Sequence, residues 1–177
     1  MSRRLLPAAL VALLIPVLSG CAGPSVPMQP AEDAGDPKCA EVIVRLPDTV
    51  GDDLVRRDTN AQATGAWGNP AAVLLRCGVP TPPPTTDRCI NINGIDWVED
   101  SSQAPRFVYT TYGRTPAAEV IIDTTVASGA ALVDLSEMMS YLPKTGGCVG
   151  AVDFAPDVTD PPTTPATTAT PAASATP

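Results

Sequence analysis

The chain has 177 residues, with 11 Lys or Arg against 19 Asp or Glu, and its formal charge of −8 argues against nucleic acid or an anionic lipid surface as a partner. It contains no histidine, which excludes a Ser-His-Asp triad, a Cys-His dyad and histidine-ligated zinc or iron. The G-x-S-x-G, Walker and G-x-G-x-x-G motifs are absent as well. We therefore expect no cofactor and no metal, and we assign no catalytic residue.

The first 20 residues have the features of a secretory leader. Arg3 and Arg4 form a basic start, and residues 5–18 form an apolar run that is shorter than a membrane span of ~20 residues. The end of the run, Leu18-Ser19-Gly20-Cys21, resembles the lipobox of bacterial lipoproteins, which implies that Cys21 is lipidated and anchors the chain to the outer face of the cytoplasmic membrane. A plain secretory leader is the alternative. Removal of Arg3 and Arg4 with the leader leaves 9 basic and 19 acidic residues, a formal charge of −10.

Two segments of biased composition flank the middle of the chain. Residues 21–36 are Pro-rich and predict a tether, while residues 156–177 are almost entirely Pro, Thr, Ala and Ser. The second segment has few large apolar groups to bury, so it predicts a disordered tail, which is either O-glycosylated or an unmodified spacer. Residues 37–155 then form one domain of ordinary size.

If Cys21 carries lipid, four cysteines remain for the domain. An even number outside the cytoplasm predicts two disulfides, and of the three possible pairings we favour Cys77–Cys89 and Cys39–Cys148. The first would close a short loop and the second would join the two ends of the domain. A structural zinc site and a redox pair are the alternatives, but the chain lacks the C-x-x-C spacing that both favour.

The first half of the domain begins with a predicted helix. Asp36 suits the N-cap and Pro37 the first helical position, and apolar residues then follow at helical spacing until Leu46-Pro47. The β-branched run at residues 42–44 leaves a strand as an alternative. Residues 54–59 and 72–79 predict strands, and WGNP at 67–70 predicts a turn.

A β-hairpin is predicted around Asn93-Gly94. A two-residue turn there places Ile92 opposite Ile95, Asn91 opposite Asp96 and Ile90 opposite Trp97. The apolar pairs share one face and the polar pair occupies the other, so the register separates the side chains by polarity.

The second half predicts another hairpin and a helix. Residues 107–112 and 118–123 read as strands around a turn at 113–116. Ser128 suits a helix cap, and an apolar stripe follows at helical spacing, formed by Leu132, Leu135, Met138, Met139 and Leu142. Residues 148–154 predict a last short strand. The fold class is α+β: a mostly antiparallel sheet of four or five strands, with one or two helices on one face and two disulfides.

Four motifs occur in order along the domain: WGNP at 67–70, LRCGVP at 75–80, NGIDW at 93–97 after Cys89, and TYGRTPA at 111–117. Together they resemble an actinobacterial family of small membrane-anchored or lipidated envelope proteins, a domain of unknown function, over residues 36–148. The resemblance implies an extracytoplasmic lipoprotein from a high-GC Gram-positive bacterium. It implies no reaction, ligand or catalytic residue.

Three functions fit these observations. The first is a non-catalytic binding or envelope-assembly module whose partner is an unknown envelope protein or glycan. Its candidate surface is Asn91, Asp96, Tyr112 and Arg114, together with the tip of the loop at 78–88, whereas Trp97 belongs to the core on its hairpin face. Trp67 and Asn93 are further candidates.

The second function is a carboxylate-based hydrolase of envelope glycans, using two of Asp96, Glu99 and Asp100. The third is a structural or antigen-like surface lipoprotein, spaced from the membrane by its tail. Facing carboxylates across a cleft would favour the second function, and hexose on the tail would favour the third.

Overall fold

The computed structural model describes residues 24–153, which form two helices and nine strands. In chain order they are α1 (Pro37–Ile43), β1 (Thr49–Val50), β2 (Leu54–Arg57), β3 (Thr64–Trp67), β4 (Val73–Val79), β5 (Cys89–Ile92), β6 (Ile95–Gln103), β7 (Arg106–Thr111), β8 (Ala117–Asp123), α2 (Ala130–Met139) and β9 (Val152–Asp153). Cys21 and the tail at 156–177 lie outside the described residues.

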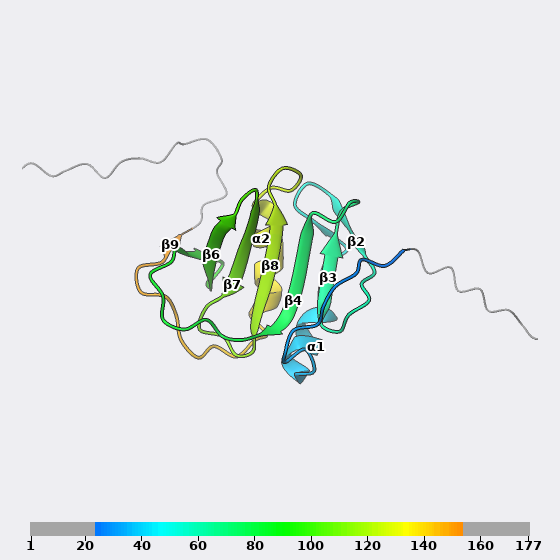
Figure 1. The fold of residues 1–177 in the computed structure, drawn as a ribbon. Coiled ribbons are helices and arrows are strands. Elements are labelled where there is room, and N and C mark those ends of the chain that lie inside the picture. Colours follow the sequence, from blue (N-terminus) through cyan, green and yellow to red (C-terminus); the bar gives the residue numbers. More distant parts are fainter. Residues whose placement is uncertain (1–23, 154–177) are drawn as a thin grey trace, which may run out of the picture.

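One sheet runs through the domain in the order β1-β2-β3-β4-β8-β7-β6-β5-β9 (Figure 1). Strands β1 to β8 pair antiparallel, and the short β9 adds to β5 in parallel. The α+β class agrees with the prediction, but the expected four or five strands are too few. The sequence signal missed β1, which has two residues, and β3, where the composition Thr-Gly-Ala-Trp lacks the β-branched run that marks a strand. Position 65 of β3 is occupied by a glycine because a Cβ there would clash with the Trp67 ring and with Leu46.

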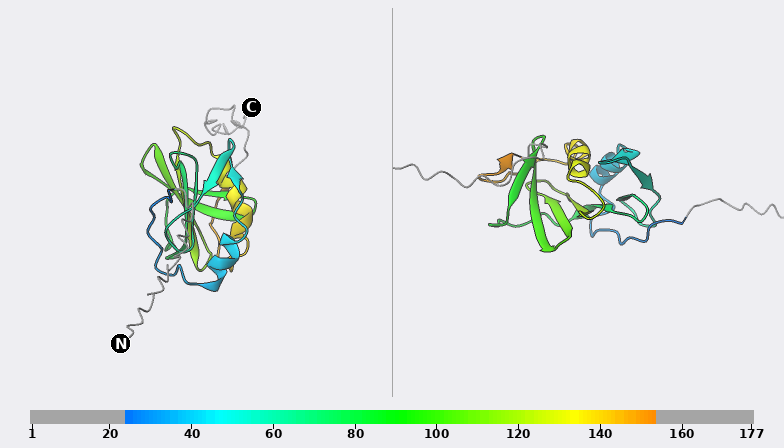
Figure 2. Two further views of the ribbon diagram at one scale, coloured as in Figure 1. Left: turned by 90° about the vertical axis from the view of Figure 1, so that its right-hand side faces the viewer. Right: turned by 90° about the horizontal axis from the view of Figure 1, so that it is seen from above.

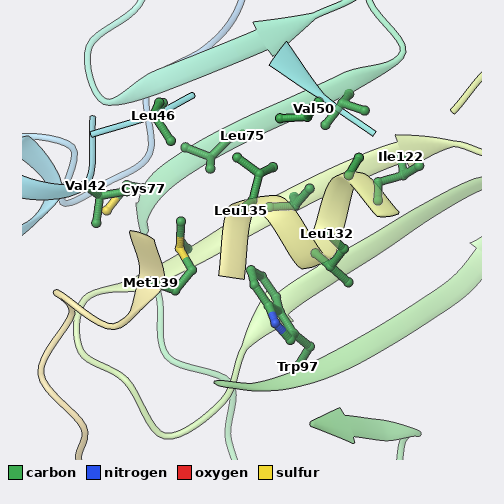
Figure 3. Packing of buried hydrophobic residues seen from close by; sticks show 14 of the residues in the cluster. Val42, Leu46, Val50, Leu75, Cys77, Trp97, Ile122, Leu132, Leu135 and Met139 are labelled. Atoms are coloured by element: carbon green, nitrogen blue, oxygen red, sulfur yellow. The ribbon is translucent and has the colours of Figure 1, made fainter. Parts of the chain in front are cut away.

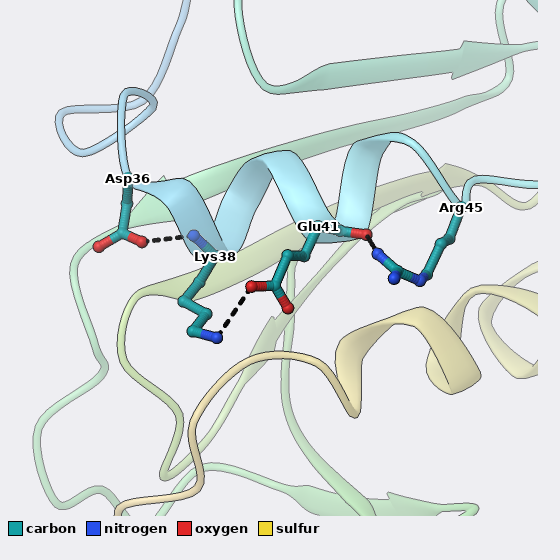
Figure 4. Close-up of polar contacts among 4 residues, drawn as sticks. All are labelled: Asp36, Lys38, Glu41 and Arg45. Atoms are coloured by element: carbon teal, nitrogen blue, oxygen red, sulfur yellow. Dashed lines mark hydrogen bonds and ion pairs between the residues drawn. The ribbon is translucent and has the colours of Figure 1, made fainter.

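The predicted helix start is confirmed. The Asp36 side chain accepts a hydrogen bond of 2.7 Å from the backbone N–H of Lys38, and Pro37 is the first helical residue (Figure 4). Lys38 also pairs with Glu41, and the Arg45 guanidinium donates to the Glu41 carbonyl at 2.6 Å. The strand alternative at residues 42–44 is therefore wrong.

The apolar stripe of the second helix packs against the sheet, as predicted. Leu132, Leu135 and Met139 are buried beside Trp97, while Met138 is only half-buried (Figure 3). The expected cap is wrong, since Gly129 is the N-cap and no side chain caps the helix. Gly129 has ordinary helical dihedrals, φ −62° and ψ −14°, so nothing in its conformation requires a glycine.

The hairpin register is confirmed for all three predicted pairs. Ile92 lies opposite Ile95, Asn91 opposite Asp96 and Ile90 opposite Trp97. Asn93 and Gly94 both have positive φ, at 53° and 80°, as a type I′ turn requires.

Both helices cover the same face of the sheet, as predicted (Figure 2). The N-terminal part of the described chain, drawn in blue, runs along the opposite face before it enters α1 (Figures 1 and 2). The backbone N–H of Asp33 donates to the Gly78 carbonyl at 2.9 Å, and Ala34 is buried. From residue 24 onward, the segment expected to be a tether therefore makes defined contacts with the domain.

We predict that Gly78→Ala destabilises the protein more than Gly94→Ala. Both glycines have positive φ, at 98° and 80°, so both substitutions introduce backbone strain of about 1–2 kcal/mol. Only at Gly78 would the new Cβ clash with the backbone of Asp33, while nothing lies within 4 Å at Gly94. The clash should cost about 1–3 kcal/mol more, measured as the free energy of unfolding in denaturant. Equal losses would contradict the docking of the N-terminal segment.

Candidate functional site

All four cysteines of the described chain form disulfides, but the pairing differs from the one we favoured. The bonds are Cys39–Cys77 and Cys89–Cys148, with Cα–Cα distances of 5.5 and 6.5 Å. Cys77 lies on β4 and Cys89 on β5, four strands further along the sheet, or roughly 19 Å at 4.8 Å per strand. A disulfide requires its Cα atoms within about 7 Å, so Cys77–Cys89 and with it Cys39–Cys148 are wrong.

The two disulfides have different surroundings. Cys39 and Cys77 are fully buried and join α1 to the central strand β4. Cys89 and Cys148 are half-exposed, and they join β5 to the segment that follows α2. The second bond therefore borders the surface that carries the candidate residues Asp96 and Tyr112.

Asp96 is the centre of a polar network next to this bond. Its Oδ1 accepts from Asn91 Nδ2 at 2.6 Å, and its Oδ2 accepts from the backbone N–H of Cys148 at 2.9 Å. Gly147 is so close that an added Cβ would be 3.0 Å from Asp96 Oδ2. Only 9% of Asp96 is exposed, so its carboxylate serves to hold the 147–148 backbone against the β5–β6 hairpin.

Arg114 fixes the preceding part of the same segment. Its guanidinium donates to the Leu142 carbonyl at 2.6 Å, and only 7% of the residue is exposed. Burial lowers the pKa of Arg114, while the negative charge of Asp96 opposes this shift. The neighbouring Gly113 carbonyl accepts from the N–H groups of Thr145 and Gly146 at 2.7 and 3.0 Å. The TYGR motif is thus the place where the chain after α2 docks.

The structure brings the four predicted surface residues together, but it buries two of them. Asn91, Asp96 and Arg114 belong to the docking network, and the half-buried Tyr112 donates its backbone N–H to the Asp96 carbonyl at 2.8 Å. The prediction that Trp97 lies in the core is confirmed: its indole N–H donates to Ser136 Oγ at 3.1 Å.

Neither of the two further candidates, Trp67 and Asn93, is placed to contribute to a site. Trp67 is also fully buried, and its indole N–H donates to the Pro47 carbonyl at 3.0 Å. Asn93 is exposed, but it occupies a turn position.

A hollow of about 520 Å³ lies beside the Cys89–Cys148 bond. Residues 84–89 form one wall, residues 147–150 with Val152 form another, and Tyr112 contributes to the lining. Thr85, Thr86 and Arg88 are exposed on the first wall. Sequence reasoning identified the loop tip and Tyr112 but missed the second wall, because that wall is placed by the Cys89–Cys148 bond and the Asp96 network. We call this feature the β5 hollow.

The three carboxylates considered for catalysis do not face one another. Residues three apart on β6 point to opposite sides of the sheet, which separates Asp96 from Glu99. Asp96 and Asp100 share a side but are four residues apart, or about 13 Å, beyond the ~5–9.5 Å that glycoside hydrolysis needs. Glu99 pairs with Arg88 at 3.2 Å.

Tyr109 is the titratable side chain most affected by the charge of Glu99. Burial raises the pKa of Tyr109 to about 12, and the charge of Glu99 adds to that shift, so the phenol stays protonated at neutral pH. Within residues 24–153, no three Cys, Asp or Glu side chains are grouped to hold a metal ion.

Neither helix of the described part is both long and apolar enough to span a bilayer. Fold and site together define a small α+β domain with two disulfides and a hollow at one end of its sheet. The chain belongs to the family described as "Protein of unknown function (DUF3515)", which it matches over residues 7–146. Comparisons with curated proteins and with solved structures gave no significant match.

We predict that Asp96→Asn lowers the free energy of unfolding by about 1–3 kcal/mol, the usual cost of weakening a buried charged hydrogen-bond group. The substitution removes the negative charge near Arg114. It also leaves a single side-chain oxygen to accept from both the Asn91 amide and the Cys148 backbone N–H. Asp52→Asn is the matched control, since Asp52 is exposed and its loss of charge is the same. Denaturant unfolding measures both variants, and equal stabilities would contradict the structural role of Asp96.

Proposed function

We propose that this protein is a lipid-anchored, non-catalytic binding or envelope-assembly module on the outer face of the cytoplasmic membrane of an actinobacterium. The observation that carries the proposal is the pair of disulfides, one of them fully buried, in a domain that follows a leader ending in Leu18-Ser19-Gly20-Cys21. Disulfides of this kind persist in oxidising compartments and are rare in the cytosol. The leader and the disulfides therefore support the same location.

The β5 hollow is the proposed binding surface. Its volume of about 520 Å³ is within the ~300–1,000 Å³ that ligand sites occupy. The exposed Thr86 and Arg88 offer hydrogen-bond donors, and Tyr112 offers a partly apolar ring, a combination that suits an envelope protein or a glycan. The walls are fixed by a disulfide and by the Asp96 network, so the surface is preorganised and loses little entropy on binding.

The absence of a facing pair among Asp96, Glu99 and Asp100 supports binding rather than glycan hydrolysis.

The test is photo-crosslinking in native membranes, with p-azidophenylalanine in place of Thr86. Thr86 lines the β5 hollow, and Val126, which is 52% exposed and outside it, is the matched control position. We expect the reporter at Thr86 to join one envelope partner that the reporter at Val126 does not reach. Adding Tyr112→Ala should remove that product while leaving the unfolding midpoint near that of the parent. The same products from both positions, or none from Thr86, would contradict the proposal.

A further inference from the structure

The described chain is attached to the domain very close to Cys21. Arg57 donates to the Pro24 carbonyl at 3.0 Å, and the backbone N–H of Val26 donates to the Asp58 carbonyl at 2.8 Å. Val26 also forms a parallel bridge with Thr59, and Met28 N–H donates to Asn60 Oδ1 at 2.7 Å. The chain is therefore fixed to the β2 end of the sheet from Pro24 onward.

The covalent path from Cys21 to this attachment is short. Three residue steps separate Cys21 from Pro24, and a fully extended chain covers at most about 11 Å over that length. A lipid on Cys21 would hold Pro24 within this distance of the bilayer surface. A flexible tether of 15 residues would have let the whole domain move away from the membrane, whereas the docked segment keeps the β2 end close to it.

The surface next to Pro24 suits contact with lipid headgroups. A groove of about 390 Å³ lies there, with an apolar wall from Leu54 and from Val55, which is 63% exposed. Arg57 links the two features, because it donates to Asn69 Oδ1 in the groove at 3.1 Å as well as to Pro24. We call this groove together with Pro24 the β2 face.

We propose that the β2 face lies against the membrane that carries the Cys21 anchor, and that the β5 hollow points away from it. The inference rests on the proposed lipid anchor. The short linker, and not an attraction between charges, holds this face near the membrane. The positive charge of Arg57 is offset by its acidic neighbours Asp53 and Asp58. The opposite end is distant: the blue start of the described chain lies beside β2 and β3, and its orange end forms β9, which pairs with β5 (Figure 1).

The two ends can be compared with one reporter. The lipidated protein is reconstituted in vesicles of equal parts phosphatidylethanolamine and phosphatidylcholine, which carry no net charge, with a small fraction of a lipid that bears a nitroxide on its headgroup. A fluorophore is attached through p-azidophenylalanine in place of Val55 or, as the matched control, Val149, both exposed valines. This chemistry leaves the disulfides intact.

We expect loss of fluorescence at position 55 and none at position 149, with no change when salt is raised. Inserting about 12 Gly and Ser residues between Gly23 and Pro24 adds roughly 20 Å of average reach and should abolish the loss at position 55. Equal losses at both positions, no loss at position 55, or a loss that survives the insertion would each overturn the inference. Intact mass separates this failure from failure of the anchor: a mature chain without lipid on Cys21 would overturn the proposed function as well.

Discussion

The antiparallel pairing of β4 with β8 is the constraint on which the rest of the structure depends. Six residue pairs join these strands, from Val73 opposite Ile122 to Val79 opposite Ala117, and Arg76 forms a 2.7 Å ion pair with Glu119 across them. The strands β1 to β4 and β5 to β8 each form a simple antiparallel run, and this pairing is where the two runs meet. The two strands are far apart in sequence, so no tight turn sets their pairing. Burial of their apolar side chains and contacts between paired residues stabilise it instead.

This pairing determines where the two ends of the domain lie. Because β8 occupies the place beside β4, the chain must leave β4 and begin β5 at the far edge, and the Pro/Thr loop at 80–88 makes that crossing. The attachment of Pro24 at β2 and the hollow at β5 are then six strand spacings apart, or about 29 Å measured along the twisted sheet. A single sheet thereby separates the end proposed to face the membrane from the end proposed to bind a partner.

Local signals explain what the sequence predicts well. The Asp36 cap, the Asn93-Gly94 turn and the stripe on α2 each depend on residues close in the chain, and the structure agrees with all three. The disulfide pairing depends on strand order, which turn chemistry and periodicity do not encode. The candidate residues Asp96 and Arg114 are adjacent in space, but their polarity serves to dock the segment at 142–148 rather than to face solvent. The hollow could not be predicted from the sequence, because one of its two walls is formed by residues 147–150, which are placed by this docking.

Non-reduced peptide mapping of the mature protein by mass spectrometry tests the strand order most directly, because each disulfide reports which strands are neighbours. We expect Cys39 linked to Cys77 and Cys89 linked to Cys148, without free thiol at these positions. A Cys77–Cys89 linkage would contradict the strand order, since that bond would require β4 and β5 to lie side by side.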